Sequence, residues 1–261
     1  MAIDKAKTTG VAAVALRNTS HVGRIGAYPL QAARAGLIGL AFVNAGQLGR
    51  QIAPYGGLDG KLSTNPLAFA APRRQGDPIM VDMTTSVVAE GKIRVYNNRG
   101  DKLPDGWIID HQGRPTNDPA DYLDDPRGAI LPLGGPVSYK GYCLGMMVEV
   151  LGGALGGQGC AAGEKVMSSN GVLFTAYNIE HFTDPQQFFD EIDTLVQHVH
   201  TSRIDPQIGE IILPGEPEFR TKRQRQAEGI PIDPTTWGRI VEAAKSLGLD
   251  PAPWEGQQLG N

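Results

Sequence analysis

The sequence predicts a mixed α/β fold, and three observations support this prediction. Short apolar runs of strand length recur along the chain, and between them lie segments whose apolar residues follow helical spacing. Glycine is frequent, at 34 of 261 residues, which indicates many tight turns and close backbone approaches. A chain of 261 residues is long enough for one or two domains with a buried core.

The first part of the chain predicts a strand, a loop, a helix and a second strand. The buried strands are VAAVAL (11–16) and GLIGLAFVN (36–44), and the helix between them is YPLQAARAG (28–36). Continuous apolar strands around a helix predict a βαβ-like unit with a covered sheet. A long loop follows at 45–66, and a loop of this length is more often functional than decorative.

The middle of the chain predicts two more strands and two helices. The strands are LAFAAP (67–72) and PIMVDM (78–83), and TTSVVAEGKIRVY (84–96) predicts a helix that three hydroxyl residues can cap. Residues 97–139 are rich in turn residues, so we expect them to wrap the surface. KGYCLGMMVEVLGGAL (140–155) is apolar on nearly all sides and predicts a buried helix.

The last third predicts one strand and three helices. These are the strand 171–178, an amphipathic helix at 185–200, a charged helix that follows ILPGEPEF (212–219) and runs to about Glu228, and a final helix at 234–247. We divide the chain into a central α/β domain, residues 1–205, and a helical C-terminal segment, residues 206–261, which we expect to pack back on the N-terminal side.

Composition and charge exclude several classes of protein. The formal net charge of −4 argues against nucleic-acid binding, which needs a basic surface. The apolar runs are too short to span a membrane, and the first ten residues lack the apolar stretch of a signal peptide. The two cysteines, Cys143 and Cys160, sit among apolar or small residues, which predicts reduced core thiols in a cytoplasmic protein.

The strong catalytic signatures are missing from the sequence. It contains no GxxxxGK[ST], HExxH or GxSxG motif, and its five histidines do not stand at metal-ligand spacing, so no metal is expected. GQGCAA (157–162) fits a dinucleotide fingerprint, but it follows a predicted buried helix where that fingerprint needs a strand. We interpret it as a glycine-rich helix exit.

Polar residues near the ends of predicted strands are candidates for a site. His21 lies with Gly23 and Gly26 between a buried strand and a helix, where ligands bind in α/β sheets, although it is equally a loop residue at a helix entry. Ser20 beside it does not make a hydrolase dyad, because adjacent residues rarely aim at each other. Lys140 starts a predicted helix, where the helix dipole disfavours a cation. It therefore indicates a bound anion or a carboxylate partner, or else a surface lysine.

Three further stretches leave two interpretations open. Asp82 ends an apolar strand and precedes hydroxyl residues, which suits a helix cap or a contact to a ribose or amide. STNP (63–66) is turn chemistry or faces a ligand. LPGEPEFR (213–220) begins a helix, with Glu216 and Glu218 in its first turn. None of these stretches decides the function alone.

Taken in order, five blocks of the sequence resemble the malate/L-lactate dehydrogenase family. The blocks are RNTSHVGRIGAY, LSTNPLAFAAP, VDMTTSVVAEGKI, LPLGGPVSYKGYCLGMMVEVLGGALGG and LPGEPEFRTKRQRQAEGIPI. This family lies outside the ordinary Rossmann dehydrogenases and includes sulfolactate, ureidoglycolate and cyclic-imine-forming members. The resemblance implies a non-Rossmann NAD(P)-binding fold with a helical C-terminal part, in a protein that is typically a homodimer. It also implies hydride transfer between NADH or NADPH and a small 2-oxo acid or cyclic imine.

The same resemblance implies the roles of individual residues. Thr64 falls where a substrate contact is expected, and His21 serves in some members as the acid/base and in others as a cofactor contact. Because His21 is the only histidine in a glycine-rich loop, we predict that it is the proton donor, with Arg24 as a candidate cation for the substrate carboxylate. The implied NAD or NADP contacts are His21, Val22, Gly23, Arg24, Ile25, Ala45, Asp82, Met83, Thr84, Lys140, Gly141, Leu213, Pro214, Gly215 and Glu216.

The sequence also departs from the family pattern. Family members begin with a helical segment that carries a Ser-His-Gly motif and a downstream arginine, and this sequence starts after it, so we expect weak or no turnover from this chain. Lys92 stands where some relatives have a charge-relay aspartate, which favours a 2-hydroxy-acid dehydrogenase. The alternatives are an inert or truncated nucleotide-binding subunit and a reductase of a cyclic imino acid.

Overall fold

The computed structural model describes residues 1–46, 49–162 and 170–251. The chain divides into two compact units, residues 1–215 and residues 216–261. Mixed helices and antiparallel strands make up the first unit, and helices make up the described part of the second. The predicted mixed α/β class is therefore confirmed.

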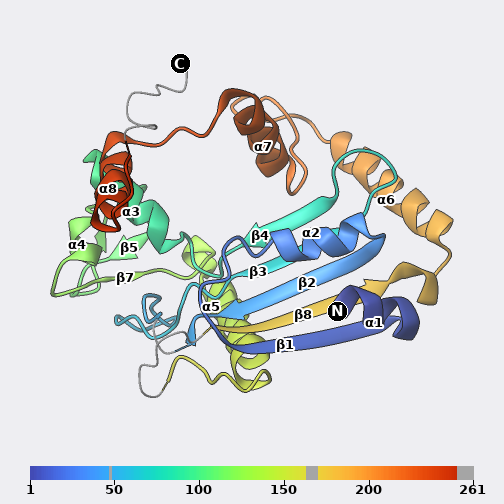
Figure 1. Ribbon diagram of the computed structural model, residues 1–261, viewed down its shortest axis with the longest axis horizontal. Helices are drawn as coiled ribbons and strands as arrows, with labels where there is room; N and C mark the ends of the chain where they lie inside the picture. Colours follow the sequence, from blue (N-terminus) through green and yellow to red (C-terminus); the bar gives the residue numbers. More distant parts are fainter. Residues whose placement is uncertain (47–48, 163–169, 252–261) are drawn as a thin grey trace. The chain divides into compact units, whose positions relative to one another are not determined.

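A five-stranded sheet forms the centre of the first unit (Figure 1). Its strands are β1 (Val11–Thr19), β2 (Leu37–Asn44), β3 (Leu67–Ala71), β4 (Ile79–Met83) and β8 (Asn170–Asn178). They lie in the order β1-β8-β2-β3-β4, and every neighbouring pair is antiparallel. All five predicted strands are confirmed, with β1 three residues longer than the apolar run that predicted it.

The predicted βαβ-like unit is wrong in its pairing. β1 and β2 do run in the same direction, but β8 lies between them and pairs with both (Figure 1). The register places Leu37 of β2 opposite Asn178 and Val43 opposite Val172. A continuous apolar run signals burial but carries no information about which distant segment becomes its neighbour, so the sequence could not reveal this insertion.

Helices cover one face of the sheet. The unpredicted helix α1 (Ala2–Thr9) packs on β1 and β8, and the predicted α2 (Ala27–Arg34) packs on β2 and β3. The approach of α2 requires a glycine at position 39, because a Cβ there would lie 2.8 Å from the Cβ of Ala32 and from the Cα of Pro29. Glycine in β2 therefore serves helix-to-sheet packing.

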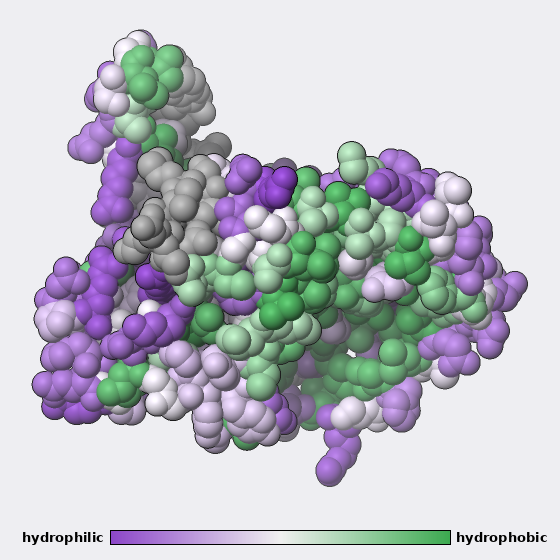
Figure 2. All heavy atoms as spheres, turned by 90° about the horizontal axis from the view of Figure 1, so that it is seen from below, coloured by the Kyte–Doolittle hydropathy of each residue, from purple (hydrophilic) through white to green (hydrophobic). Residues whose placement is uncertain are grey.

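The opposite face of the sheet is only partly covered, so the prediction of a covered sheet is wrong for this face. A shallow apolar cavity of about 340 Å³ lies on this side, lined by Ile38, Leu40, Phe69, Tyr177, Ile179, Phe182, Thr183 and Phe188. Hydrophobic residues also gather over a hollowed part of the molecular surface in Figure 2. Apolar residues that gather on an uncovered sheet face mark it as a candidate interaction surface.

Residues 97–139 build a second core, which contradicts the prediction that they only wrap the surface. Ile108 and Ile130 are fully buried there, together with Ile93 and Tyr122. The strands that carry Ile108 and Ile130 are two residues long, too short for any periodic pattern to register. The elements are α3 (Glu90–Arg99), β5 (Ile108–Ile109), β6 (Pro115–Thr116), α4 (Ala120–Leu123) and β7 (Ala129–Ile130), with the strands in the order β6-β5-β7.

The helix predicted from residue 84 begins only at Glu90. The hydroxyl of Thr84 donates to the carbonyl of Ser86 at 2.9 Å, and the hydroxyl of Ser86 donates to the carbonyl of Val88 at 2.7 Å. These hydroxyls bind local carbonyl oxygens and cap nothing, and Ala89 precedes the first helical residue. Side-chain bonds of this kind compete with a helix, which explains the late start.

The predicted helix at 140–155 is confirmed as a helix but not as a buried one. It consists of α5 (Tyr139–Val148) followed by a π-helix, η3 (Glu149–Ala154). Met146, Val150 and Leu155 are exposed, and so is Cys143, which is therefore not the core thiol that the sequence predicted. Gly157 and Gly159 adopt positive φ after the helix, in agreement with a glycine-rich exit.

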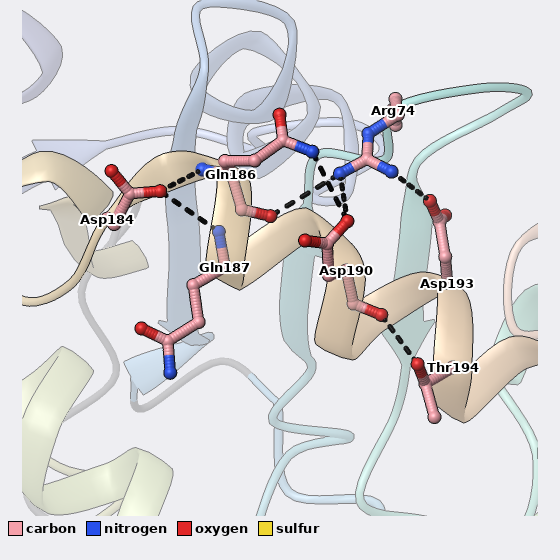
Figure 3. Close-up of polar contacts among 7 residues, drawn as sticks. All are labelled: Arg74, Asp184, Gln186, Gln187, Asp190, Asp193 and Thr194. Atoms are coloured by element: carbon pink, nitrogen blue, oxygen red, sulfur yellow. Dashed lines mark hydrogen bonds and ion pairs between the residues drawn. The ribbon is translucent and has the colours of Figure 1, made fainter.

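The predicted helix at 185–200 is α6 (Pro185–His200) (Figure 1). Asp184 caps it by accepting from the backbone N–H groups of Gln186 and Gln187. Arg74, in the connection between β3 and β4, pairs with Asp190 at 2.6 Å and Asp193 at 3.1 Å (Figure 3). These ion pairs tie α6 to the sheet, while none of its residues is fully buried.

The second unit contains α7 (Glu216–Glu228) and α8 (Pro234–Ser246), and both helices were predicted. Asp233 caps α8 by accepting from the backbone N–H and the hydroxyl of Thr236, at 2.9 and 2.7 Å. Across the described residues, no helix is both long enough and apolar enough to cross a membrane.

Candidate functional site

Several predicted site segments meet at one edge of the large sheet. Because neighbouring strands are antiparallel, β1, β2 and β4 end at the same edge at which β3 and β8 begin. The loop after β1, Ala45 after β2, Thr64 before β3 and Thr84 after β4 therefore share this edge. This convergence depends on the strand order and is invisible in any local pattern.

The loop after β1 carries His21, whose side chain is exposed. Its ring Nδ1 accepts a hydrogen bond from the backbone N–H of Gly23 at 3.0 Å, so Nε2 is the ring nitrogen that can donate to a ligand. Gly23 has φ +71°, a conformation that favours glycine. Ile25, in contrast, is buried in the core with Ala41 and contributes backbone alone to any contact.

Arg24 and Asp82 fasten this loop to the end of β4. The Nε of Arg24 lies 3.1 Å from Oδ2 of Asp82, and its guanidinium also contacts the sulfur of Met80 at 2.9 Å. A Cβ at Gly26 would lie 2.5 Å from the same Asp82 oxygen, so only glycine fits. The two predicted site residues meet, and a substrate carboxylate at Arg24 has to compete with Asp82.

The segment before α7 lies beside β4. The carbonyl of Pro214 accepts a hydrogen bond from the backbone N–H of Met80 at 3.0 Å, and Leu213 is buried. Gly215 has φ +94° and ends the first unit. Glu216, the remaining predicted contact of this stretch, is the first residue of α7 in the second unit and pairs with Arg220 at 3.4 Å.

A chain of hydrogen bonds joins Thr64 to Gly141. The carbonyl of Thr64 accepts from the backbone N–H and the hydroxyl of Thr85, at 3.0 and 3.1 Å. The carbonyl of Thr85 accepts from the N–H of Leu133, whose own carbonyl accepts from Gly141 at 3.1 Å. Hydrogen bonds therefore connect Thr64, the predicted substrate contact, with the predicted cofactor contact at Lys140–Gly141.

Lys140 is the second residue of α5 and is exposed. No carboxylate of the described residues lies within 4.0 Å of its ammonium group, so the carboxylate partner that the sequence allowed is not found there. A cation at this helix end together with the helix dipole favours an anion. Met83, the last residue of β4, is half-buried.

Three buried polar residues lie near this edge, of which two, Asn44 and Glu149, were missed from the sequence, while the third belongs to the STNP stretch. They are Asn44, Asn65 and Glu149, with exposed fractions of 0%, 0% and 3%. The carboxylate of Glu149 accepts hydrogen bonds from the side chains of both asparagines and from the N–H of Ala161. The available signal was a single acid inside the apolar run MMVEV, because a buried carboxylate needs several donors.

Metal ligands do not gather in the part of the chain that the structure describes: no three His, Cys, Asp or Glu side chains come together as they would around an ion.

Cys160 is partly buried near Glu149. Burial, followed by the negative charge of Glu149, raises the pKa of the Cys160 thiol, which disfavours the reactive thiolate.

Comparison with known proteins defines the class. A family profile described as malate/L-lactate dehydrogenase matches residues 1–241. The chain is 37% identical over 257 residues to a malate dehydrogenase of Pyrococcus abyssi, covering 95% of this chain and 69% of that protein. It is 36% identical over 254 residues to hydroxycarboxylate dehydrogenase B of Escherichia coli K12, again covering 95% and 69%.

A solved structure agrees with these matches. The sulfolactate dehydrogenase of Methanocaldococcus jannaschii superposes with a TM-score of 0.80 at 35% identity, covering 95% of this chain and 70% of that one. These three relatives are named as dehydrogenases of malate, of hydroxycarboxylates and of sulfolactate. The chain belongs to the malate/L-lactate dehydrogenase family.

Proposed function

We propose that this chain is an NAD(P)-dependent oxidoreductase that transfers a hydride between a nicotinamide cofactor and a small 2-hydroxy or 2-oxo acid. The observation that carries the proposal is the meeting of the family-like segments at one sheet edge. Family membership and relatives named for malate and hydroxycarboxylates support the substrate class. Lys92, exposed on α3, stands where the resemblance favours a hydroxy acid over a cyclic imine.

The residues at this edge fit a dinucleotide. Lys140, without a carboxylate partner among the described residues, suits a phosphate next to the start of α5. Gly23 leaves open space where a side chain would stand, which lets a ligand approach its backbone. When bound, the nicotinamide gives or takes the hydride. The other cofactor contacts that we propose are Val22 to Ile25, Ala45, Asp82 to Thr84, Gly141, and Leu213 to Glu216.

The chemistry assigned to this chain's residues concerns the proton and the substrate carboxylate. We assign the proton donor to His21, because its Nε2 is the ring nitrogen left to donate once Nδ1 accepts from Gly23. Arg24 binds the substrate carboxylate in competition with Asp82, and Thr64 contacts the substrate. We further propose a cytoplasmic homodimer. The partly covered sheet face supports the dimer, since exposed apolar surface favours association.

The proposal is tested by titrating the chain with NADH and NADPH and by following oxidation of each cofactor with a panel of 2-oxo acids and one cyclic imino acid. Binding with turnover of a 2-oxo acid supports the dehydrogenase. Binding without turnover supports the inert nucleotide-binding subunit. Preference for the imino acid supports the reductase, and failure to bind either cofactor contradicts the proposal.

A further inference from the structure

Glu149 forms a buried carboxylate cluster that the proposed chemistry does not use. Its Oε1 accepts from Nδ2 of Asn65 at 2.8 Å. Its Oε2 accepts from the N–H of Ala161 at 2.8 Å and from Nδ2 of Asn44 at 3.3 Å. All three partners are N–H donors, and the two carboxylate oxygens accept all three hydrogen bonds.

Each arm of this cluster reaches a different segment of the candidate site. Asn65 directly follows Thr64, the proposed substrate contact, and Asn44 directly precedes Ala45, a proposed cofactor contact. The helix that ends next to Glu149 begins at Tyr139 and carries Lys140 in its first turn. One carboxylate therefore connects the substrate side of the site with the cofactor side.

Asn65 is held in a conformation that costs free energy. Its φ is +36°, in the region that residues other than glycine seldom adopt. Its Nδ2 donates both to Glu149 and to the carbonyl of Gly145 at 3.1 Å, and since both partners are acceptors the amide orientation is fixed. Its Oδ1 is buried and has no partner among the described residues. Surrounding contacts have to hold such a residue in place, and the bond to Glu149 is the shortest one that its side chain makes.

We propose that Glu149 is a positioning residue. It holds Asn65 in its left-handed conformation and thereby fixes the position of the preceding residue, Thr64. The carbonyl of Thr64 accepts hydrogen bonds from the backbone N–H and the hydroxyl of Thr85. This inference rests on the proposed function, because it assigns Thr64 to the substrate side. Glu149 itself touches no reacting atom in this account.

The substitution Glu149→Gln separates the two sides of the cluster. A glutamine amide offers one acceptor oxygen to three donors. It keeps two bonds if that oxygen faces Asn44 and Ala161, and its NH2 group then faces the NH2 group of Asn65. This orientation keeps the larger number of hydrogen bonds, so the variant loses the bond to Asn65 and keeps the bonds to Asn44 and Ala161. The matched control is Glu191→Gln on α6, where the side chain is exposed.

The experiment compares three readouts in the wild type and both variants. For Glu149→Gln we expect the KM for the 2-oxo acid to rise about tenfold, the scale of one lost hydrogen bond to a charged group. The Kd for NADH or NADPH should stay within about twofold of the wild-type value, since the hydrogen bond to Asn44, next to Ala45, is kept. In hydrogen exchange, the amide of Thr85 should exchange faster and that of Ala161 should not. Glu191→Gln should match the wild type in all three.

Several results overturn the inference. One is an unchanged exchange rate at the Thr85 amide in folded Glu149→Gln protein. Another is a fall in stability accompanied by equal rises in the substrate KM and the cofactor Kd, which indicates a merely structural role. If Glu149→Gln does not fold, Asn65→Ala replaces it, because alanine removes the amide while the cost of the positive φ remains, and the same exchange pattern is expected. If the wild type neither binds cofactor nor turns over, the proposed function fails, and the exchange data still decide the positioning claim.

Discussion

Replacing Gly141 with alanine perturbs the point where α5 locks onto the preceding loop. An added Cβ would lie 2.3 Å from the carbonyl oxygen of Leu133 and 2.5 Å from its nitrogen, both backbone atoms. The chain has to move to relieve this contact, and overpacking of this kind costs about 1–3 kcal/mol. Alanine regains at most about 1 kcal/mol of helix propensity. With about 2 kcal/mol for a clash against backbone atoms and up to about 1 kcal/mol regained, the expected net loss of unfolding free energy is about 1–2 kcal/mol. NAD(P)H should also bind more weakly as Lys140 shifts.

The matched control is Gly91→Ala at the start of α3. A Cβ at Gly91 meets nothing within 4 Å, and its φ is not positive. The same substitution should therefore stabilise the protein by about 0.4–1 kcal/mol. Urea unfolding of the wild type and both variants at one temperature provides the comparison. A Gly141→Ala protein that is as stable as the wild type, or more stable, would refute the close approach at Leu133.

Two further predictions concern titratable groups. A thiol reagent at mildly alkaline pH should label exposed Cys143 faster than Cys160, whose pKa is raised by burial and by Glu149; a Cys143→Ser variant should then show one slow thiol, and equal rates in the wild type contradict this reasoning. The pKa of Asp233 is lowered, first by the side-chain hydrogen bond from Thr236 and next by its backbone N–H. Because the pKa of Asp233 is lower in the folded protein, the ionised cap stabilises the folded state at pH values above the ordinary carboxyl pKa of 3.8. That stabilisation is lost as the pH falls through the folded pKa. Asp233→Ala should therefore lower helical circular dichroism near neutral pH and narrow the gap to the wild type in acid; identical curves at both pH values argue against the cap.

The long elements of the fold could be predicted from the sequence, while their partners could not. The apolar run 36–44 and the helical spacing of 185–200 are local signals, and both elements appear where they were expected. The insertion of β8 between β1 and β2 brings together residues more than a hundred positions apart. No local pattern contains that information.

The candidate site could likewise be predicted only in part from the sequence. His21 and Lys140 stand out because each is an unusual residue type for its position in a loop or at a helix start. The grip of Asp82 on Arg24, by contrast, depends on the tertiary approach of Gly26. Glu149 is a lone acid in an apolar run, and its role emerges only when Asn65 is placed against it in space.

The most direct test of the account is the affinity of NADH and NADPH for the wild type, for His21→Ala and for a control, His198→Ala, on the exposed surface of α6. Titration by nicotinamide fluorescence gives the Kd for each protein. The placement of His21 beside the cofactor predicts a Kd raised about three- to tenfold in His21→Ala, as expected for one lost polar contact, and a wild-type Kd in His198→Ala. An unchanged Kd in His21→Ala would contradict the placement of the cofactor at this edge of the sheet.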